Sequence, residues 1–175
     1  MPQNNFLDEM KAIKSVMKES GQKLVFKSAV ATRDKFKEMI NKEPKVLHIS
    51  CHGLKIPIKR IAFSFNPDAV EQENCLLFEK ENGEGELVNS QQLNRIISQA
   101  MPTLDVVFLA ACDSEFVGKI FLKCGARHVI CVKKKREVLD DAAIDFTATF
   151  YGKMLNGMNV CEAFSAAKRD VEFKH

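Results

Sequence analysis

The stretch VLHISCHGLK, from Val46 to Lys55, decides how this sequence is interpreted. It begins with the apolar residues of a buried β-strand and then runs into a thiol, an imidazole and a glycine at Cys51, His52 and Gly53. Such a strand end is packed, binds a ligand, or supplies half of a catalytic site. The choice depends on whether the chain provides a second half elsewhere.

A second apolar run ends on reactive side chains in the same way. The run DVVFLAAC, from Asp105 to Cys112, is short and bounded by turn signals, which predicts a strand buried on both faces and ending at Cys112. Asp113 and Ser114 follow, and then a helix. In open parallel sheets ligands bind outside the carboxyl ends of the strands, so the two strand ends are expected at one edge of one sheet.

Helices and strands alternate around these two runs. Helices are expected at 6–18, 32–41, 90–100, 114–123, 140–155 and 160–171, strands at 23–30, 45–51, 105–112 and 127–132, and a hairpin at 74–89 with its turn at Asn82-Gly83. Thr32 and Ser90 are expected to cap their helices. This order predicts a three-layer α/β/α fold with a mainly parallel sheet and an inserted β-hairpin.

The composition restricts the class of protein. A chain of 175 residues, 46% hydrophobic and 28% charged, fits one globular domain spanning 1–175, which could have been cut from a larger protein. The net charge of +3 is too small to indicate nucleic acid, and no apolar run reaches the roughly 20 residues that would span a bilayer. We therefore expect neither a membrane nor a nucleic-acid partner.

The six cysteines point to a reducing compartment. They form no C-x-x-C pair, several lie in apolar runs, and the N-terminus does not resemble a secretion signal. We expect reduced thiols in a cytoplasmic protein, with Cys51, Cys124 and Cys131 serving mainly as core residues.

Together the two strand ends could perform amide hydrolysis. Cys112 precedes a helix, whose N-terminus favours a thiolate, and His52 could transfer the proton to the leaving amine. The backbone N–H groups of Gly53 and Cys112 could hold the oxyanion. Taken singly, however, a cysteine or a histidine at a strand end is more often a packed core residue, and spacing alone leaves the two interpretations about equal.

Other chemistries have less support. A zinc site from Cys51, His52 and Cys112 lacks a fourth ligand at suitable spacing, so no metal is expected. No phosphate-binding loop is present, so no nucleotide or other organic cofactor is expected either. His48 and His128 are interpreted as satisfied structural histidines.

The order of several motifs resembles the CHAT domain, a caspase-like peptidase domain related to separase. The matching motifs are His52-Gly53, Cys112-Asp113-Ser114, Gly125-Ala126, Asp140-Asp141-Ala142-Ala143, Phe150-Tyr151, Gly157 and the alanine-rich stretch 163–167. The resemblance covers nearly the whole chain and implies a caspase-like fold. It implies that His52 is the general acid/base and Cys112 the nucleophile of a cysteine endopeptidase. It also implies a protein or peptide substrate lying extended at the sheet edge, and a partner such as a tetratricopeptide-repeat region.

The sequence departs from the family pattern after the strand at 127–132. Such domains usually carry a Trp there, whereas this chain has no Trp and has Lys133, Lys134, Lys135 and Arg136. These residues form either a solvated basic turn or a site that attracts an acidic substrate or partner. Asp113 and Ser114 either contact the substrate or cap the following helix. Asp113, Asp68 and Asp105 are the candidates for an acidic residue in the substrate pocket.

Two rival functions remain open. The first is a catalytically dormant caspase-like binding or regulatory module that needs a partner or another domain for activation. The second is a nonenzymatic, doubly wound regulator of the flavodoxin type, which predicts that Cys112 is no more reactive than the other five cysteines.

Overall fold

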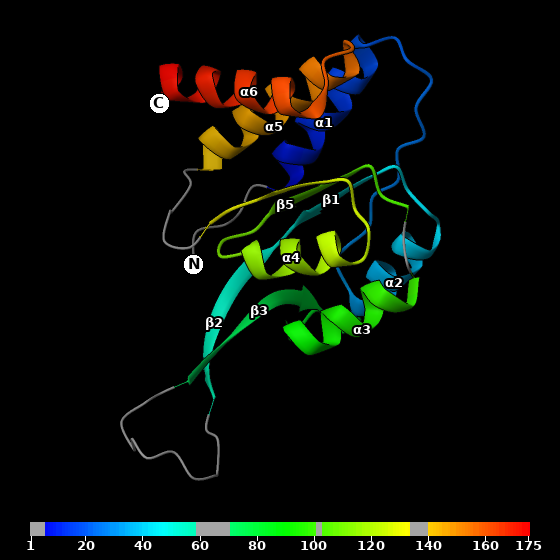
Figure 1. Ribbon diagram of the computed structural model, residues 1–175, viewed down its shortest axis with the longest axis vertical. Helices are drawn as coiled ribbons and strands as arrows, with labels where there is room; N and C mark the ends of the chain where they lie inside the picture. The colour runs from blue at the N-terminus through cyan, green and yellow to red at the C-terminus, as the bar shows by residue number, and fades with distance from the viewer. Residues whose placement is uncertain (1–5, 59–70, 101–102, 134–139) are drawn as a thin grey trace. The chain divides into compact units, whose positions relative to one another are not determined.

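The computed structural model describes residues 6–58, 71–100, 103–133 and 140–175. The chain divides into two compact units (Figure 1). Unit 1 joins the two ends of the chain, residues 1–28 and 137–175, and unit 2 comprises residues 29–136. Each unit is described by itself.

Unit 1 consists of three helices. They are α1 (Phe6–Glu19), α5 (Asp140–Leu155) and α6 (Val160–Lys174). Helix α5 packs against both α1 and α6. Small alanines on α6, Ala163 and Ala167, are fully buried and allow close helix packing, while Phe150 on α5 is also fully buried. The start of α6 is fixed by a capping box between Asn159 and Glu162.

The parallel sheet of unit 2 has three strands. They are β1 (Val46–Ser50), β5 (Val106–Ala110) and β6 (His128–Cys131), in the order β1-β5-β6. The central strand β5 is buried at four of its five residues, as its apolar run predicts. The strand at 127–132 was expected to be buried as well, but β6 is only partly buried because it lies at the edge of the sheet.

The second sheet of unit 2 is antiparallel. It contains β2 (His52–Ile58), β3 (Glu71–Glu79) and β4 (Gly85–Asn89), in the order β2-β3-β4. The predicted hairpin corresponds to β3 and β4. In its turn Gly83 has φ +83° and the Asn82 Oδ1 accepts a hydrogen bond of 3.1 Å from the N–H of Glu84. Strand β2 was not predicted, so His52 and Gly53 begin a strand of this second sheet and do not end a strand of the parallel one.

Three helices cover the sheets of unit 2. They are α2 (Arg33–Asn41), α3 (Ser90–Ala100) and α4 (Glu115–Lys123). Helix α3 packs against α2 and α4, and α4 packs on β5 and β6 (Figure 1). A Cβ at Gly118 of α4 would lie 3.2 Å from a Val129 methyl, so this glycine brings the helix close to the sheet. The core between these layers includes Leu47, Leu76, Leu93, Val107, Val117 and Phe121.

The mixed α/β class predicted from the sequence is confirmed. A parallel three-stranded sheet with helices and an inserted hairpin is compatible with a three-layer α/β/α fold. The Thr32 cap is also confirmed, since its hydroxyl accepts a 3.1 Å hydrogen bond from the N–H of Lys35. The predicted single domain over 1–175 stays a prediction. Within the described residues, no helix is both long and apolar enough to cross a membrane.

Two further local predictions are wrong. Residues 23–30 form no strand and are exposed, because no neighbouring strand pairs with them in the described sheets. The helix predicted to be capped by Ser90 is capped by its neighbour. The Asn89 Oδ1 accepts a 2.9 Å hydrogen bond from the N–H of Gln92, and the Gln92 side chain accepts one of 2.9 Å from the N–H of Asn89.

Candidate functional site

The candidate nucleophile lies in the turn between β5 and α4. The sequence predicted that Cys112 is the last residue of the strand, and this is wrong. Strand β5 ends at Ala110 and α4 begins at Glu115, so Cys112 lies in the turn between them. Cys112 is exposed. The strand stops early because the chain must reverse into α4 within a few residues, which extended backbone cannot do.

Gly53 lies directly against the backbone of Cys112. A Cβ placed on Gly53 would stand 1.7 Å from the carbonyl oxygen of Cys112 and 3.5 Å from its nitrogen, so only glycine fits. The N–H of Cys51 donates a 3.4 Å hydrogen bond to the carbonyl of Ala110. The two strand ends that the sequence singles out are therefore adjacent, although β2 and β5 belong to different sheets.

His52 is the first residue of β2 and is half-buried. It lies opposite Leu77 of β3 in the antiparallel pairing. Among the hydrogen bonds between described residues, none joins its ring to the Cys112 thiol. The contact between the two candidate catalytic positions is thus made by the backbone of Gly53.

Asp113 and Ser114 complete the turn. Asp113 has φ +51°, a left-handed conformation that is uncommon for residues other than glycine. Its Oδ2 lies 3.2 Å from the Lys55 Nζ. Sequence reasoning did not single out Lys55, because the strand that carries it, β2, was not predicted.

Ser114 is fully buried and does not use its side chain as a helix cap, contrary to one of its two predicted roles. Its hydroxyl donates to the Leu109 carbonyl at 3.4 Å and accepts from the N–H of Val132 at 3.2 Å. Ser114 therefore ties the turn to the ends of β5 and β6. In this arrangement it offers no exposed surface to a substrate.

The predicted basic segment is described only in part. Lys133 is exposed, while Lys134, Lys135 and Arg136 lie outside the described residues, as does Asp68. Asp105 is excluded from a pocket at Cys112. It precedes β5, at the opposite end of the strand, and pairs there with Arg127 at 3.0 Å and Lys45 at 3.9 Å.

Four of the five remaining cysteines are less exposed than Cys112. Burial raises the pKa of the Cys51 thiol to about 12. Burial, followed by a nearby glutamate, also raises the pKa of Cys75 and Cys131. Cys161, in the first turn of α6, is exposed, and Cys124 is half-buried. Cys161 is therefore the thiol that resembles Cys112 most in exposure.

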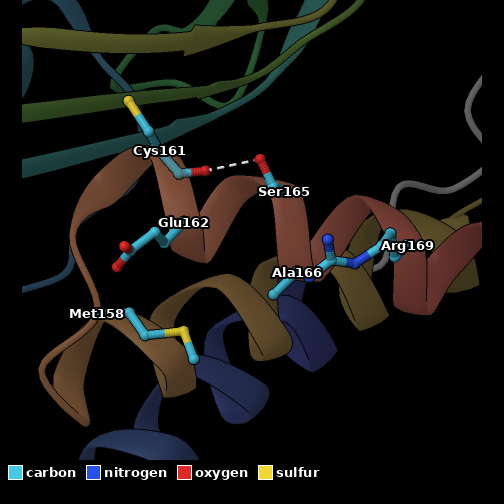
Figure 2. A pocket seen from close by; sticks show the side chains of 6 residues that line it. All are labelled: Met158, Cys161, Glu162, Ser165, Ala166 and Arg169. Atoms are coloured by element: carbon cyan, nitrogen blue, oxygen red, sulfur yellow. Dashed lines mark hydrogen bonds between the residues drawn. The ribbon is translucent and has the colours of Figure 1, made fainter.

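Two hollows are described on the surface, one in each unit, and Cys112 lines neither of them. One runs along α6 and is lined by Met158, Cys161, Glu162, Ser165, Ala166 and Arg169 (Figure 2). Another lies at the amino ends of the parallel strands, around Lys45, Asp105 and Arg127. In the described part of the chain, no three His, Cys, Asp or Glu side chains gather closely enough to hold a metal ion.

Comparison with known families identifies the chain. The model of the CHAT domain matches residues 3–173, which include both units and the turn at Cys112. A search of curated proteins gave no match. The family is caspase-like, in keeping with the resemblance carried by His52-Gly53 and Cys112-Asp113-Ser114. The chain belongs to the CHAT domain family.

Proposed function

We propose that the protein is a cysteine endopeptidase with Cys112 as nucleophile and His52 as general acid/base. The observation that supports this most is the contact of the Gly53 backbone with the backbone of an exposed Cys112. Because Gly53 has no side chain, it does not block the access of a substrate to the Cys112 sulfur. Membership in a caspase-like family supports the same reaction.

The proposed reaction proceeds through an acyl-enzyme. The imidazole of His52 takes the proton of the Cys112 thiol and becomes an imidazolium. The sulfur attacks the carbonyl carbon of the substrate, a C–S bond forms, and the carbonyl electron pair moves onto the oxygen. The N–H groups of Gly53 and Cys112 donate to that oxyanion. When the intermediate collapses, the C–N bond breaks and the imidazolium of His52 gives its proton to the departing amine. Water then hydrolyses the thioester and regenerates the thiol.

The burial of the other thiols supports the choice of nucleophile. A thiol whose pKa is raised by burial holds little thiolate at neutral pH, and this applies to the buried Cys51 and Cys75 and to the half-buried Cys131. Cys161 is exposed and lies at a helix N-terminus, yet no histidine belongs to its stretch of sequence. It is a matched reference for any effect of exposure or helix dipole alone.

The test is alkylation with limiting iodoacetamide near neutral pH, measured for each cysteine by peptide mass spectrometry. We expect Cys112 to react at least about tenfold faster than Cys161, as for a cysteine activated by its surroundings. His52→Ala should remove this difference, while His48→Ala should not. Equal rates at Cys112 and Cys161 in the unmodified protein would contradict an assembled catalytic pair and favour the dormant module.

Cleavage is measured next, with a peptide library and Cys112→Ala as the inactive control. We propose a protein or peptide substrate in extended conformation and a cytoplasmic location. Asp113 and the basic residues Lys133, Lys134, Lys135 and Arg136 are proposed as substrate contacts. If those four residues attract an acidic segment, cleavage of acidic peptides should fall as ionic strength rises.

One observation favours the alternative, a module that needs a partner for activation. Alternation along β2 assigns His52 to the face of the strand opposite to that of Gly53, which meets Cys112. A partner such as a tetratricopeptide-repeat region would then act by turning the start of β2 so that the imidazole approaches the thiol. This alternative predicts that Cys112 reacts like Cys161 until the partner is added.

A further inference from the structure

The turn that presents Cys112 is held in a strained conformation. Among the described residues, Glu43 and Asp113 are the non-glycine residues with positive φ, and Asp113 directly follows the candidate nucleophile. A left-handed conformation of this kind costs on the order of 1 kcal/mol and persists only where the surroundings enforce it. What enforces it at Asp113 therefore determines where the thiol is held.

Three successive residues of the turn are each fixed by a contact with another part of unit 2. The Cys112 carbonyl lies against Gly53. The Asp113 carboxylate pairs with Lys55 at 3.2 Å. The Ser114 hydroxyl is fixed between Leu109 and Val132 in the buried interior. Two of these three contacts come from β2.

Lys55 and Gly53 share one face of β2, because alternate residues of a strand point to the same side. The strand thus contacts the turn twice, with a backbone contact at Gly53 and a charged contact at Lys55. The second contact falls on the residue with the strained backbone.

The Lys55–Asp113 pair is the least exposed ion pair between described residues. Its side chains are 22% and 24% exposed. The second carboxylate oxygen of Asp113, Oδ1, is buried and has no hydrogen-bond partner among the described residues. The carboxylate therefore depends on the Lys55 ammonium for compensation of its charge, and a half-buried carboxylate left without it would move toward water.

We propose that Lys55 is a positioning residue that holds the Cys112 turn in its reactive conformation through Asp113. This inference rests on the proposed peptidase function. Lys55 does not touch the reacting atoms. It keeps Asp113 left-handed and so directs the preceding thiol toward the substrate.

The variants separate positioning from a simple charge effect on the thiol. Lys55→Met leaves a negative charge beside Cys112 and Asp113→Asn leaves a positive one, so a charge effect alone would change the alkylation rate of Cys112 in opposite directions. Positioning predicts that both variants slow it by a similar factor, on the order of tenfold, and that the double variant is no slower than either. Lys55→Arg should restore most of the rate because it keeps the cation.

A matched control is available on the neighbouring helix. Lys119→Met removes the Lys119–Glu115 pair, whose side chains are 67% and 42% exposed, without touching the turn. We expect the alkylation rate of Cys112 in this variant to equal that of the unmodified protein.

Once a peptide that the protein cleaves is known, the kinetic constants give a second test. Lys55→Met should lower kcat by up to about a hundredfold and leave KM nearly unchanged, since a misplaced nucleophile weakens stabilisation of the transition state more than substrate binding.

Amide hydrogen exchange across residues 111–117 tests the inference independently of catalysis. Lys55→Met should speed exchange there by on the order of tenfold, and Lys119→Met should not, because loss of the pair raises the population of open turn. Unchanged exchange in Lys55→Met would overturn the inference even if Cys112 proves reactive. If Cys112 reacts no faster than Cys161 but exchange responds as expected, Lys55 does hold the turn and the peptidase proposal fails instead.

Discussion

Gly53 is the residue of β2 whose backbone packs directly against the backbone of Cys112. In Gly53→Ala the new methyl would stand 1.7 Å from the Cys112 carbonyl oxygen. Neither group can rotate away, because the methyl is attached directly to the Cα and the oxygen belongs to the backbone. We expect the free energy of unfolding to fall by about 1–3 kcal/mol, as for other overpacked sites, and Cys112 to lose its selective reactivity. Urea unfolding and alkylation measure the two effects.

The control for this substitution is Gly152→Ala in α5. A Cβ there would meet a Val16 methyl at 3.8 Å, an ordinary contact. Because alanine is the better helix former, this variant should be stabilised by roughly 0.5–1 kcal/mol or left unchanged. Equal stability of Gly53→Ala and the unmodified protein would contradict the close approach of β2 to the turn.

The buried thiol of Cys51 predicts a loss of stability at alkaline pH. Burial raises its pKa to about 12, whereas a thiol in the unfolded chain titrates near about 8.5. Above that lower value the unfolded state loses a proton that the folded state keeps. The contribution of this group to stability is thus complete below about pH 8.5 and is lost as pH rises toward 12.

We measure this as the slope of the free energy of unfolding against pH between 8 and 10.5, under reducing conditions. Cys51→Ala should flatten the slope by up to about 1.4 kcal/mol per pH unit, the value of one proton. Cys161→Ala, which removes an exposed thiol, should leave it unchanged. Parallel slopes in all three proteins would show that Cys51 titrates alike in the folded and unfolded states.

Much at the residue scale was predictable, and the rest depends on tertiary contact. That His52-Gly53 and Cys112 come together was inferred from two apolar runs ending on reactive side chains, and Gly53 does meet Cys112. The Lys55–Asp113 pair was not predicted because it depends on strand β2, and the sequence pattern of residues 52–58 does not predict a strand. The roles of His52 and Cys112 in catalysis stay predictions.

At the scale of the elements, the cap of α3 gives a prediction that separates two neighbouring residues. Asn89 and Gln92 exchange two hydrogen bonds of 2.9 Å, whereas Ser90 lies within the first turn. Asn89→Ala should therefore lower the free energy of unfolding by about 1 kcal/mol, the usual value of an N-cap. Ser90→Ala should change it by less than half as much. Thermal unfolding of both variants measures the two losses of stability. A larger loss in Ser90→Ala than in Asn89→Ala would show that Ser90 is the N-cap.

The elements that were predicted well are those with a local signal. The helix expected from apolar residues at helical spacing, α1, agrees with the sequence pattern within a residue. The exposed stretch 23–30 has strand-like composition but no partner strand in the described sheets. Strand β2 is the reverse case: it includes Lys55 and Pro57, which disfavour strands, yet it pairs along its whole length with β3. Strand formation is decided by pairing more than by propensity, which explains both errors.

At the scale of the whole molecule, unit 1 is formed by the two ends of the chain, and unit 2 is formed by the residues between them. The sequence gives no sign of this, because α1 and α5 lie more than a hundred residues apart and helical spacing does not say which helix packs on which. The contact between them is partly polar. The Thr147 hydroxyl, 1% exposed, donates a 3.0 Å hydrogen bond to the carboxylate of Glu9, which is 6% exposed. This buried bond gives the N-terminal helix a defined position on α5.

Substitution of Thr147 tests whether the two units unfold separately. Thr147→Val keeps the shape of the side chain and removes a hydrogen bond from a buried carboxylate, which should cost about 1–3 kcal/mol. We expect amide exchange to speed up in α1, α5 and α6, while β1, β5 and β6, whose core lies within unit 2, keep their protection. Thr149→Val on the same helix, at a half-buried position, should have little effect. If exchange in β5 rises as much as in α5, the chain unfolds as one cooperative domain, as the length of the sequence first suggested, and the division into units is one of shape alone.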